Sequence, residues 1–317
     1  MLAALLVLGA PDVERRERRR ERREGRCERH DVTIPEHCKR FSETIDFPHK
    51  IVPASWAGES WPMAIYAEND VVSDSICVHG AFDNIQQTLL AVKQVPGSNF
   101  LDVGGNIGWY TLVMAAHGIM THYVEPNEKN RKLLELSLCM NPKMAAKVRI
   151  VPFALGPKAK RCGMYTPGLG HTNQGNTLAI CDGDDHPAHF NHLVSAMEIR
   201  TLDELVSSRI IDLGFESGKT VMKIDTEGYE KRTFDGAKEF MTGPLAPRLI
   251  HSEFYPDMLK IHGPETATQY LEMVHQLGYR ILEANGAEVT DFKGAATKYV
   301  PFTDLNFVKA LATVEQA

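Results

Sequence analysis

Hydrophobic residues recur in two alternating patterns from about residue 84 onward. Short apolar runs predict buried strands, and segments with apolar residues at helical spacing predict helices. The expected strands cover residues 99–103, 122–124, 148–153, 161–165, 199–200, 221–224, 248–254 and 305–308. The expected helices cover residues 84–95, 109–117, 127–141, 202–206, 229–241 and 266–277. Strands that alternate with helices are typical of an α/β domain built on a parallel sheet.

Other stretches carry weaker patterns. Residues 35–62 hold four prolines and two tryptophans with little periodicity, which predicts an irregular lead-in, and residues 63–80 read as short strands and turns. Residues 168–192 predict a long loop. Asn285-Gly286 predicts a hairpin turn that pairs residues 279–284 with 287–292. We therefore expect a charged tail over 1–30, an irregular lead-in and entry helix over 31–97, and the main domain over 98–310.

Composition and charge narrow the class of protein. The 317 residues are 43% hydrophobic with a formal net charge of -6, which is typical of a globular protein and gives no reason to expect nucleic-acid binding. Glu14 to Arg29 mixes glutamate with arginine and predicts a solvated tail. The apolar run Met1 to Ala10 is too short to span a bilayer, and the arginines follow it rather than precede it. We lean toward an intracellular location, with the secretory pathway as the alternative.

The cysteines bear on the same question. Six cysteines show neither a C-x-x-C pair nor the spacing of a zinc site, at positions 27, 38, 77, 139, 162 and 181. Scattered reduced thiols are the favoured interpretation. In an oxidising compartment Cys27 could pair with Cys38, or Cys162 with Cys181, although no Asn-x-Ser/Thr acceptor occurs in the sequence.

The stretch from Asp102 to Gly108, DVGGNIG, joins a buried strand to a helix through glycines. Such a loop presents backbone N–H groups to a ligand. About twenty residues later a second strand ends at Glu125, where a nucleotide-binding α/β fold places a carboxylate that binds ribose. The pair of features predicts a nucleotide cofactor. The alternative is an ordinary strand-to-helix turn followed by a surface acid, neither of which binds a ligand.

Two further strands end in titratable residues. Asp225 and Glu227 follow the strand over 221–224, and His251 and Glu253 lie in the strand over 248–254. Ligands of open α/β sheets bind at the carboxyl ends of strands. These four residues could align an acceptor and remove its proton, with Asp225 as the first candidate. Asp225, Glu227 and Glu253 could instead hold a divalent cation, but the favoured expectation is no metal.

Five motifs in order resemble the FkbM-type family of S-adenosylmethionine-dependent methyltransferases. They are DVGGNIG at 102–108, EPNE at 125–128, ALG at 154–156, TLD at 201–203 and KIDTEGYE at 223–230. Gly105 replaces the family's usual alanine, a small change, and Tyr229 replaces a small residue. The resemblance implies a class I methyltransferase fold, Rossmann-like, with a seven-stranded, mostly parallel sheet, an antiparallel final strand and helices on both faces.

The resemblance also implies a cofactor, S-adenosylmethionine, and a place for it. The loop through Gly104, Gly105, Asn106 and Gly108 would contact the methionine part, with Asp102 supporting that loop. Glu125 would hold the ribose, and Asn127 and Ala154 would lie near the adenine. The implied reaction is methylation of a hydroxyl on a sugar or natural product, so the expected partner is a small-molecule or glycan acceptor. An NAD-dependent oxidoreductase and a non-catalytic cofactor-binding protein remain as alternatives.

Overall fold

The computed structural model describes residues 32–68, 70–166, 177–181 and 190–309. Its centre is a seven-stranded sheet with the strand order β12-β13-β11-β10-β3-β4-β5. These strands are β3 (Asn99–Val103), β4 (Met120–Val124), β5 (Val148–Val151), β10 (Thr220–Ile224), β11 (Leu249–Phe254), β12 (Tyr279–Glu283) and β13 (Thr303–Lys309). The final strand, β13, runs antiparallel to both of its neighbours, and the pairs through β11, β10, β3, β4 and β5 are parallel. This confirms the predicted sheet.

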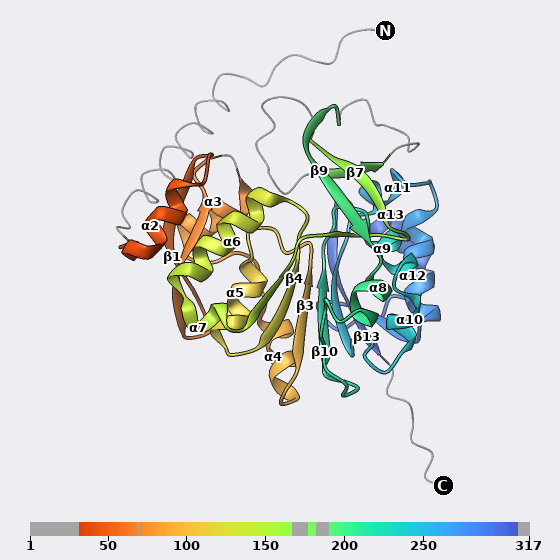
Figure 1. Cartoon of the computed structure of the whole chain (residues 1–317). Coiled ribbons are helices and arrows are strands. Elements are labelled where there is room, and N and C mark those ends of the chain that lie inside the picture. The colour runs from red at the N-terminus through yellow and green to blue at the C-terminus, as the bar shows by residue number, and fades with distance from the viewer. Residues whose placement is uncertain (1–31, 69, 167–176, 182–189, 310–317) are drawn as a thin grey trace, which may run out of the picture.

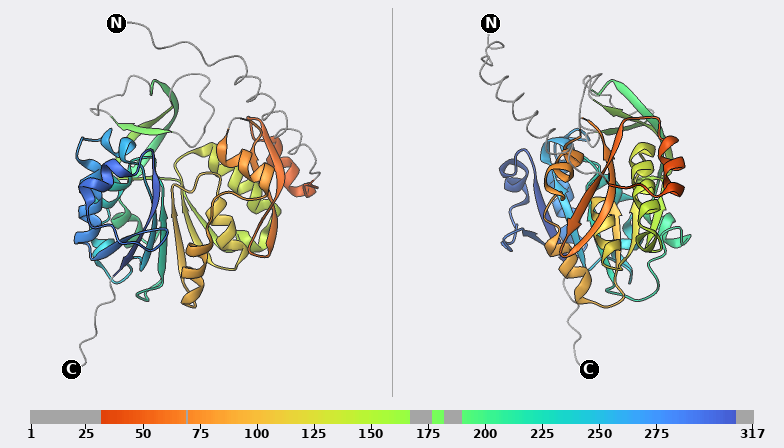
Figure 2. Two further views of the ribbon diagram at one scale, coloured as in Figure 1. Left: turned by 180° about the vertical axis from the view of Figure 1, so that it is seen from behind. Right: turned by 90° about the vertical axis from the view of Figure 1, so that its left-hand side faces the viewer.

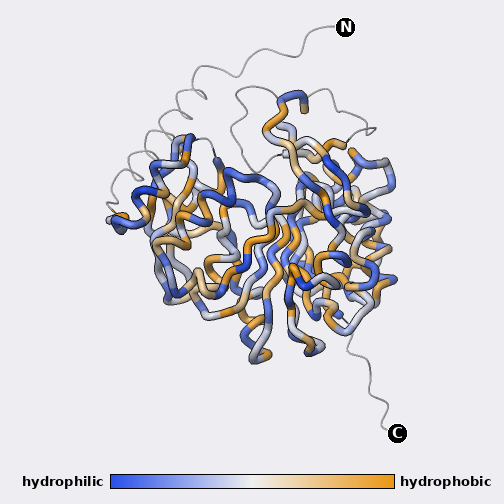
Figure 3. The backbone as a smooth tube through the Cα atoms, in the orientation of Figure 1, coloured by the Kyte–Doolittle hydropathy of each residue, from blue (hydrophilic) through white to orange (hydrophobic). Residues whose placement is uncertain are grey.

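Helices cover both faces of this sheet, which Figure 1 shows on edge between two layers. One layer contains α4 (Gln86–Gln94), α5 (Trp109–Ala116), α6 (Glu128–Met140) and α7 (Pro142–Ala145). The other contains α8 (Leu202–Ser207), α9 (Glu230–Asp235), α10 (Lys238–Thr242), α11 (Pro256–Lys260), α12 (Thr266–Gln276) and α13 (Phe292–Lys298). Each layer has its own hydrophobic core against the sheet, and Figure 3 shows the apolar residues gathered along the central strands. Burial of both sheet faces explains why the strands read as continuous apolar runs.

The N-terminal part is more regular than the sequence predicts. Instead of an irregular lead-in, it contains α2 (Glu36–Glu43) and an antiparallel hairpin of β1 (His49–Trp56) and β2 (Glu59–Tyr66). The helix α3 (Val71–His79) then begins at Asp70, whose side chain accepts a hydrogen bond from Ser73 N, so the expected short strands and turns are wrong there. The prolines misled the prediction because Pro53 and Pro62 face each other in a two-stranded ribbon, where a missing N–H is tolerated at an edge.

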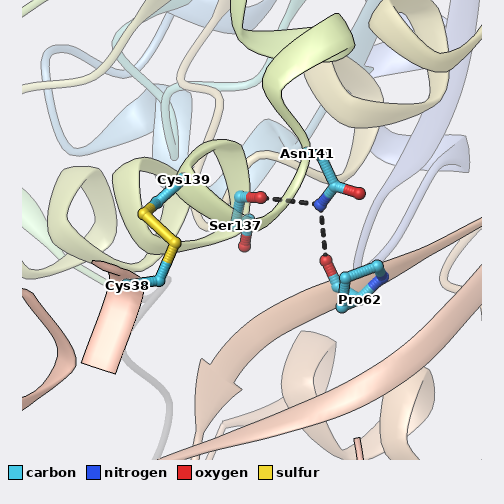
Figure 4. The surroundings of a disulfide bond; sticks show 5 residues. All are labelled: Cys38, Pro62, Ser137, Cys139 and Asn141. Atoms are coloured by element: carbon cyan, nitrogen blue, oxygen red, sulfur yellow. Dashed lines mark hydrogen bonds between the residues drawn. A yellow bond between two sulfur atoms is a disulfide. The ribbon is translucent and has the colours of Figure 1, made fainter. Parts of the chain in front are cut away.

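A disulfide and a side-chain amide attach this N-terminal part to α6. Cys38 of α2 is bonded to Cys139 of α6, with 5.9 Å between the Cα atoms. The Asn141 side chain donates to Pro62 O and to Ser137 O, which ties the hairpin to the end of the same helix (Figure 4). The segment before residue 98 is therefore joined to the main domain covalently.

A second sheet of four strands, in the order β6-β9-β7-β8, stands over the carboxyl ends of the central strands (Figure 2). Its strands are β6 (Ala154–Leu155), β7 (Lys160–Thr166), β8 (Leu178–Cys181) and β9 (His192–Arg200). The expected loop over 168–192 therefore contains a strand, although most of that range lies outside the described residues. Cys162 and Cys181 form a disulfide between β7 and β8.

The cysteines overturn the expectation of scattered reduced thiols. Among the described cysteines none is free, and Cys77 is disulfide-bonded as well. Pairing of Cys162 with Cys181 is confirmed, whereas pairing of Cys38 with Cys27 is wrong because Cys38 bonds Cys139. Cys27 itself lies outside the described residues. Spacing along the chain could not reveal a bond between cysteines 101 positions apart.

Two other expectations were wrong in the C-terminal layer. The helix predicted over 229–241 is two short helices, α9 and α10, separated at Gly236. A Cβ atom on Gly236 would lie 1.9 Å from Gly156 O, so this close backbone approach interrupts the helix. The predicted hairpin at Asn285-Gly286 is reduced to a single bridge between Leu282 and Glu288, because β12 pairs with β13 instead.

Within the described residues, no helix is both long and apolar enough to cross a bilayer.

Candidate active site

A cleft opens where β3, β4 and β10 end beneath the second sheet. It contains about 750 Å³ of empty space, counting its open mouth. Its floor comes from the strand ends and its roof from Met164, Ala179 and Met197 of the second sheet. Of the sequence-predicted site residues, the cleft is lined by Gly104, Asn106, Glu125, Ala154, Asp225 and Glu227.

The glycine loop is held tightly against the neighbouring strands. The backbone N–H groups of Gly104 and Gly105 both donate to Val124 O, and Gly104 has a φ of +73°. A Cβ atom on Gly104 would lie 1.8 Å from Asp225 O, so only glycine fits where the loop passes the end of β10. Gly108 begins α5 with a φ of +89° and packs against Leu134 without lining the cleft. The close approach brings the loop and Asp225 into one site.

Glu125 follows the end of β4 and is bonded to the glycine loop. One carboxylate oxygen accepts a hydrogen bond from Asn106 N at 2.9 Å, and the other accepts one from Asn127 N at 2.7 Å. Burial raises the pKa of Glu125 to about 7, against the lowering effect of these two N–H groups. Each oxygen retains a lone pair that could accept a further hydrogen bond, so the carboxylate can still bind a ligand hydroxyl.

Asn127 and Asp102 support the site from outside the cleft. The Asn127 side chain accepts a hydrogen bond from Lys129 N and so caps α6, and it is not among the cleft residues. Asp102 is fully buried and accepts a hydrogen bond from the Thr111 hydroxyl at 2.6 Å. That bond joins the end of β3 to α5 across the glycine loop. Both side chains therefore stabilise the local structure that positions Gly104 and Glu125.

Lys223 is a site residue that the sequence interpretation missed. Its ammonium group donates to Gly104 O at 3.1 Å and forms an ion pair with Asp225 at 3.2 Å, although the residue is only 7% exposed. Burial disfavours its charge, but Asp225 and Asp102 outweigh burial and raise the pKa of Lys223. The lysine thus bridges the glycine loop and the acid. A lysine in an apolar strand, followed two residues later by an aspartate, was the available signal.

The loop after β10 is organised by a second residue missed as a functional candidate, Glu230. Its buried carboxylate accepts hydrogen bonds from Thr226 N, the Thr226 hydroxyl and Gly228 N. Glu227, between these donors, has a φ of +54° and lines the cleft. Burial, followed by the charge of Asp225, raises the pKa of Glu227 well above its ordinary value. Asp225 and Glu227 therefore face the same space in different electrostatic surroundings.

His251 and Glu253 lie on the neighbouring strand but do not line the cleft. His251 stacks on Tyr110 with 6.0 Å between the ring centres, and its Nδ1 is 3.1 Å from Asn306 Oδ1. Burial, and next the charge of Asp225, raise the pKa of Glu253 to about 11. Three predicted acids therefore interact electrostatically, but only Asp225 and Glu227 line the cleft.

The described residues contain two groups of three metal-ligand types whose ligand atoms lie within 4.8 Å of one another. They are His37 with Cys38 and Cys139, and Asp83 with His251 and Asp304. The first includes a disulfide and so lacks free thiolates. The carboxylates of Asp225, Glu227 and Glu253 are not brought within that distance, so the structure does not support them as a joint cation site.

An unpaired buried oxygen in the cleft indicates that the cleft residues fit a nucleotide-type cofactor. The Asn106 side-chain oxygen is buried without a hydrogen-bond partner, and Asn106 lines the cleft beside Glu125. An unpaired buried acceptor is costly unless a ligand or water donates to it. Gly104 of the glycine loop, Glu125 and this acceptor line one cleft at the carboxyl ends of parallel strands, which is where open α/β folds bind their ligands.

The family model described as the methyltransferase FkbM domain matches residues 102–281, which is more than half of the chain. This chain belongs to the FkbM methyltransferase family. Its matched region begins at Asp102 of the glycine loop and includes the acids after β10 and the strand β11.

Solved structures that resemble the chain include three methyltransferases. The methyltransferase FkbM of Methylobacillus flagellatus is 14% identical, with a TM-score of 0.39, over 67% of this chain and 43% of that one. This chain therefore spans less than half the length of that protein. A SAM-dependent methyltransferase of Agrobacterium tumefaciens is 13% identical over 81% and 69% of the two chains, with a TM-score of 0.38. A TehB-like SAM-dependent methyltransferase of Corynebacterium glutamicum is 10% identical over 72% and 90%, with a TM-score of 0.36. No curated protein matches the sequence.

Proposed function

We propose that this protein transfers a methyl group from S-adenosylmethionine to a hydroxyl oxygen of a sugar or natural product. The observation that carries the proposal is that one cleft is lined both by the glycine loop with Glu125 and by the two acids Asp225 and Glu227. The first pair suits a nucleoside with an amino-acid tail, and the second suits a hydroxyl that must lose a proton. Membership of a methyltransferase family favours this reaction over hydride transfer to NAD.

The bound cofactor supplies an electrophilic methyl group on a positively charged sulfur. Gly104, Asn106 and Glu125 would hold the cofactor, and Asp225 and Glu227 would orient the acceptor hydroxyl toward that methyl group and take the proton that the hydroxyl loses. The main task of the protein is therefore alignment, followed by removal of this proton.

Asp225 and Glu227 have different roles in this proposal. The ion pair with Lys223 fixes the position of the Asp225 carboxylate, which orients the acceptor hydroxyl. Glu227 is the better proton acceptor, because its raised pKa gives its carboxylate more basicity than an ordinary glutamate. Glu253, one strand further along the sheet, interacts electrostatically with both acids but does not line the cleft, and neither does His251 on the same strand.

An aromatic pair beside the acids favours a carbohydrate as the acceptor. Tyr255 lies 5.8 Å from Phe302 between ring centres, and Phe302 is 55% exposed although it is apolar. Tyr255 also interacts electrostatically with Glu227. An apolar ring face next to carboxylates suits a sugar, which presents C–H groups on one face and hydroxyls at its edge.

The test is to incubate the full chain with methyl-labelled S-adenosylmethionine and fractionated cell extract, and to ask which fraction gains label. Label in glycans or small molecules supports the proposal, and label confined to protein contradicts the choice of acceptor. Asp225→Asn and Glu227→Gln are expected to retain cofactor binding and to lose at least ten-fold in turnover. Glu216→Gln is a matched control, since the Glu216 side chain is 78% exposed and precedes the amino end of β10, whereas Asp225 and Glu227 follow the carboxyl end of that strand. Cofactor binding with no transfer to any fraction would instead favour a non-catalytic binding protein.

A further inference from the structure

A group of metal-ligand side chains outside the cleft remains unexplained by the proposed reaction. Asp83 comes from the loop before α4, His251 from β11 and Asp304 from β13, and their ligand atoms lie within 4.8 Å of one another. The three residues come from positions far apart in the sequence, so the fold, rather than local sequence, assembles them. We propose that they bind a divalent cation, Zn²⁺ or Mn²⁺.

The distance within the group suits a shared ion better than a direct bond. His251 Nε2 lies 3.8 Å from the nearer oxygen of Asp304, which is too far for a hydrogen bond. Two ligands that each lie about 2.1 Å from one ion are separated by roughly 3 to 3.5 Å. A small inward movement of either side chain would therefore bring both into contact with one cation.

The hydrogen bonds around His251 fix the nitrogen that would bind the ion. The amide group of Asn306 donates to Gln87 Oε1 at 3.3 Å, so its oxygen is the atom that faces His251 Nδ1 at 3.1 Å. Because that oxygen can only accept, Nδ1 carries the proton. In a neutral imidazole the lone pair is then on Nε2, directed toward the Asp304 carboxylate. Metal-binding histidines usually donate their other N–H to an oxygen in this way.

Asp83 is similarly held from behind. One of its oxygens accepts a hydrogen bond from the Tyr110 hydroxyl at 2.6 Å, and the other accepts one from Asn84 N at 2.7 Å. A carboxylate has about four lone-pair positions, so two hydrogen bonds leave it free to bind an ion. Carboxylates that bind metals are commonly supported by such bonds. One imidazole and two carboxylates form a ligand set that suits Zn²⁺ or Mn²⁺.

The position of the group suggests what a bound ion would do. Three protein ligands leave at least one coordination position open, as in catalytic rather than structural sites. Asp304 of β13 lies opposite Glu253 of β11, and β11 is the neighbour of β10, which leads to Asp225 in the cleft, so the ion would lie on the acceptor side of the site. There it could bind an acceptor oxygen and lower the pKa of its hydroxyl. This role rests on the proposed function, whereas cation binding does not.

The test measures cation binding by the full chain in the absence of cofactor and acceptor. After treatment with a chelator, calorimetry with Zn²⁺ and with Mn²⁺ should show saturable binding of one ion per chain at micromolar concentration for at least one of the two metals. Asp83→Asn and Asp304→Asn should each weaken binding at least ten-fold. Asp257→Asn, a matched change at a side chain that is 61% exposed, should leave it unchanged.

Several results would overturn the proposal. They are no saturable binding of either metal, binding that survives both substitutions, or loss of binding in Glu227→Gln but not in Asp83→Asn. Asparagine can still accept the hydrogen bond from Tyr110, so folding of Asp83→Asn is expected, and thermal unfolding of the variant checks it. Because no methyl transfer is measured, failure of this test leaves the proposed reaction standing, and failure of that reaction leaves cation binding to be judged separately.

Discussion

Replacement of Gly105 by alanine, the residue usual at this position in the family pattern, should destabilise this chain. A Cβ atom there would lie 2.3 Å from Tyr123 Cδ2 and 2.4 Å from Tyr123 Cε2. Carbon atoms in ordinary contact are about 3.5–4.0 Å apart, so the ring would have to move by more than about 1 Å. Tyr123 is fully buried, and its hydroxyl donates a hydrogen bond to Asn106 O, so it has no free space to enter. Overpacking of this kind costs about 1–3 kcal/mol.

A double-mutant cycle separates this clash from other effects. We expect Gly105→Ala to lower the free energy of unfolding by about 1–3 kcal/mol, and Tyr123→Val to lower it by about 3 kcal/mol through the cavity it leaves. In the Tyr123→Val background, Gly105→Ala should cost little, because the methyl group then enters vacated space. Urea unfolding of the four proteins measures the cycle. Strictly additive losses would refute the reasoning, since they would show that the two side chains do not compete for one volume.

Three further predictions concern stability and the site. The double substitution Cys38→Ser/Cys139→Ser should lower the free energy of unfolding by about 4–5 kcal/mol, because the bond closes a loop of 101 positions, and an unchanged urea midpoint would contradict this. The folded-state pKa of Glu125 is about 7 and exceeds its unfolded value. The free energy of unfolding of the wild type, relative to that of Glu125→Gln, should therefore be highest below pH 4.5 and fall as the pH rises to 7. If urea unfolding gave the same difference between the two proteins from pH 4.5 to about pH 8, the assignment would be contradicted. Glu230→Ala should lower the free energy of unfolding by about 1–3 kcal/mol, because the N–H groups of Thr226 and Gly228 lose their acceptor. It should also reduce turnover more than cofactor binding. Steady-state kinetics and binding isotherms measure the two effects, and a larger loss in binding than in turnover would contradict the prediction.

The alternation of apolar strands and amphipathic helices was sufficient to predict a parallel α/β sheet, whereas its seven strands and antiparallel final strand were implied by the family resemblance. Each of its parallel strands is buried on both faces, so the signal is continuous along the strand, as in Thr220–Ile224. The hairpin β1–β2 was missed, and of the second sheet only β7 and the end of β9 were expected, because these strands are partly exposed and are fixed by long-range bonds. Disulfides such as Cys38–Cys139 are among these bonds, and no local pattern encodes them.

The candidate site was predictable where its residues are adjacent in the chain. The glycine loop and the acids after β10 stand in short motifs, and the structure brings Gly104, Glu125 and Asp225 to one cleft. Lys223 and Glu230 act through the bonds they make to backbone groups in the folded chain, so their letters alone did not reveal a role. The structural cost of the change at Gly105 was likewise hidden, because it depends on the Tyr123 ring from the next strand.

The cofactor assignment is tested most directly by equilibrium binding of S-adenosylhomocysteine to the full chain. Saturable binding at one site per chain is expected, with no binding of NAD and with at least a ten-fold loss in Glu125→Ala. The exposed change Glu216→Gln should leave the affinity unchanged. Absence of binding, or equal binding by Glu125→Ala, would contradict the assignment of this cleft as the cofactor site.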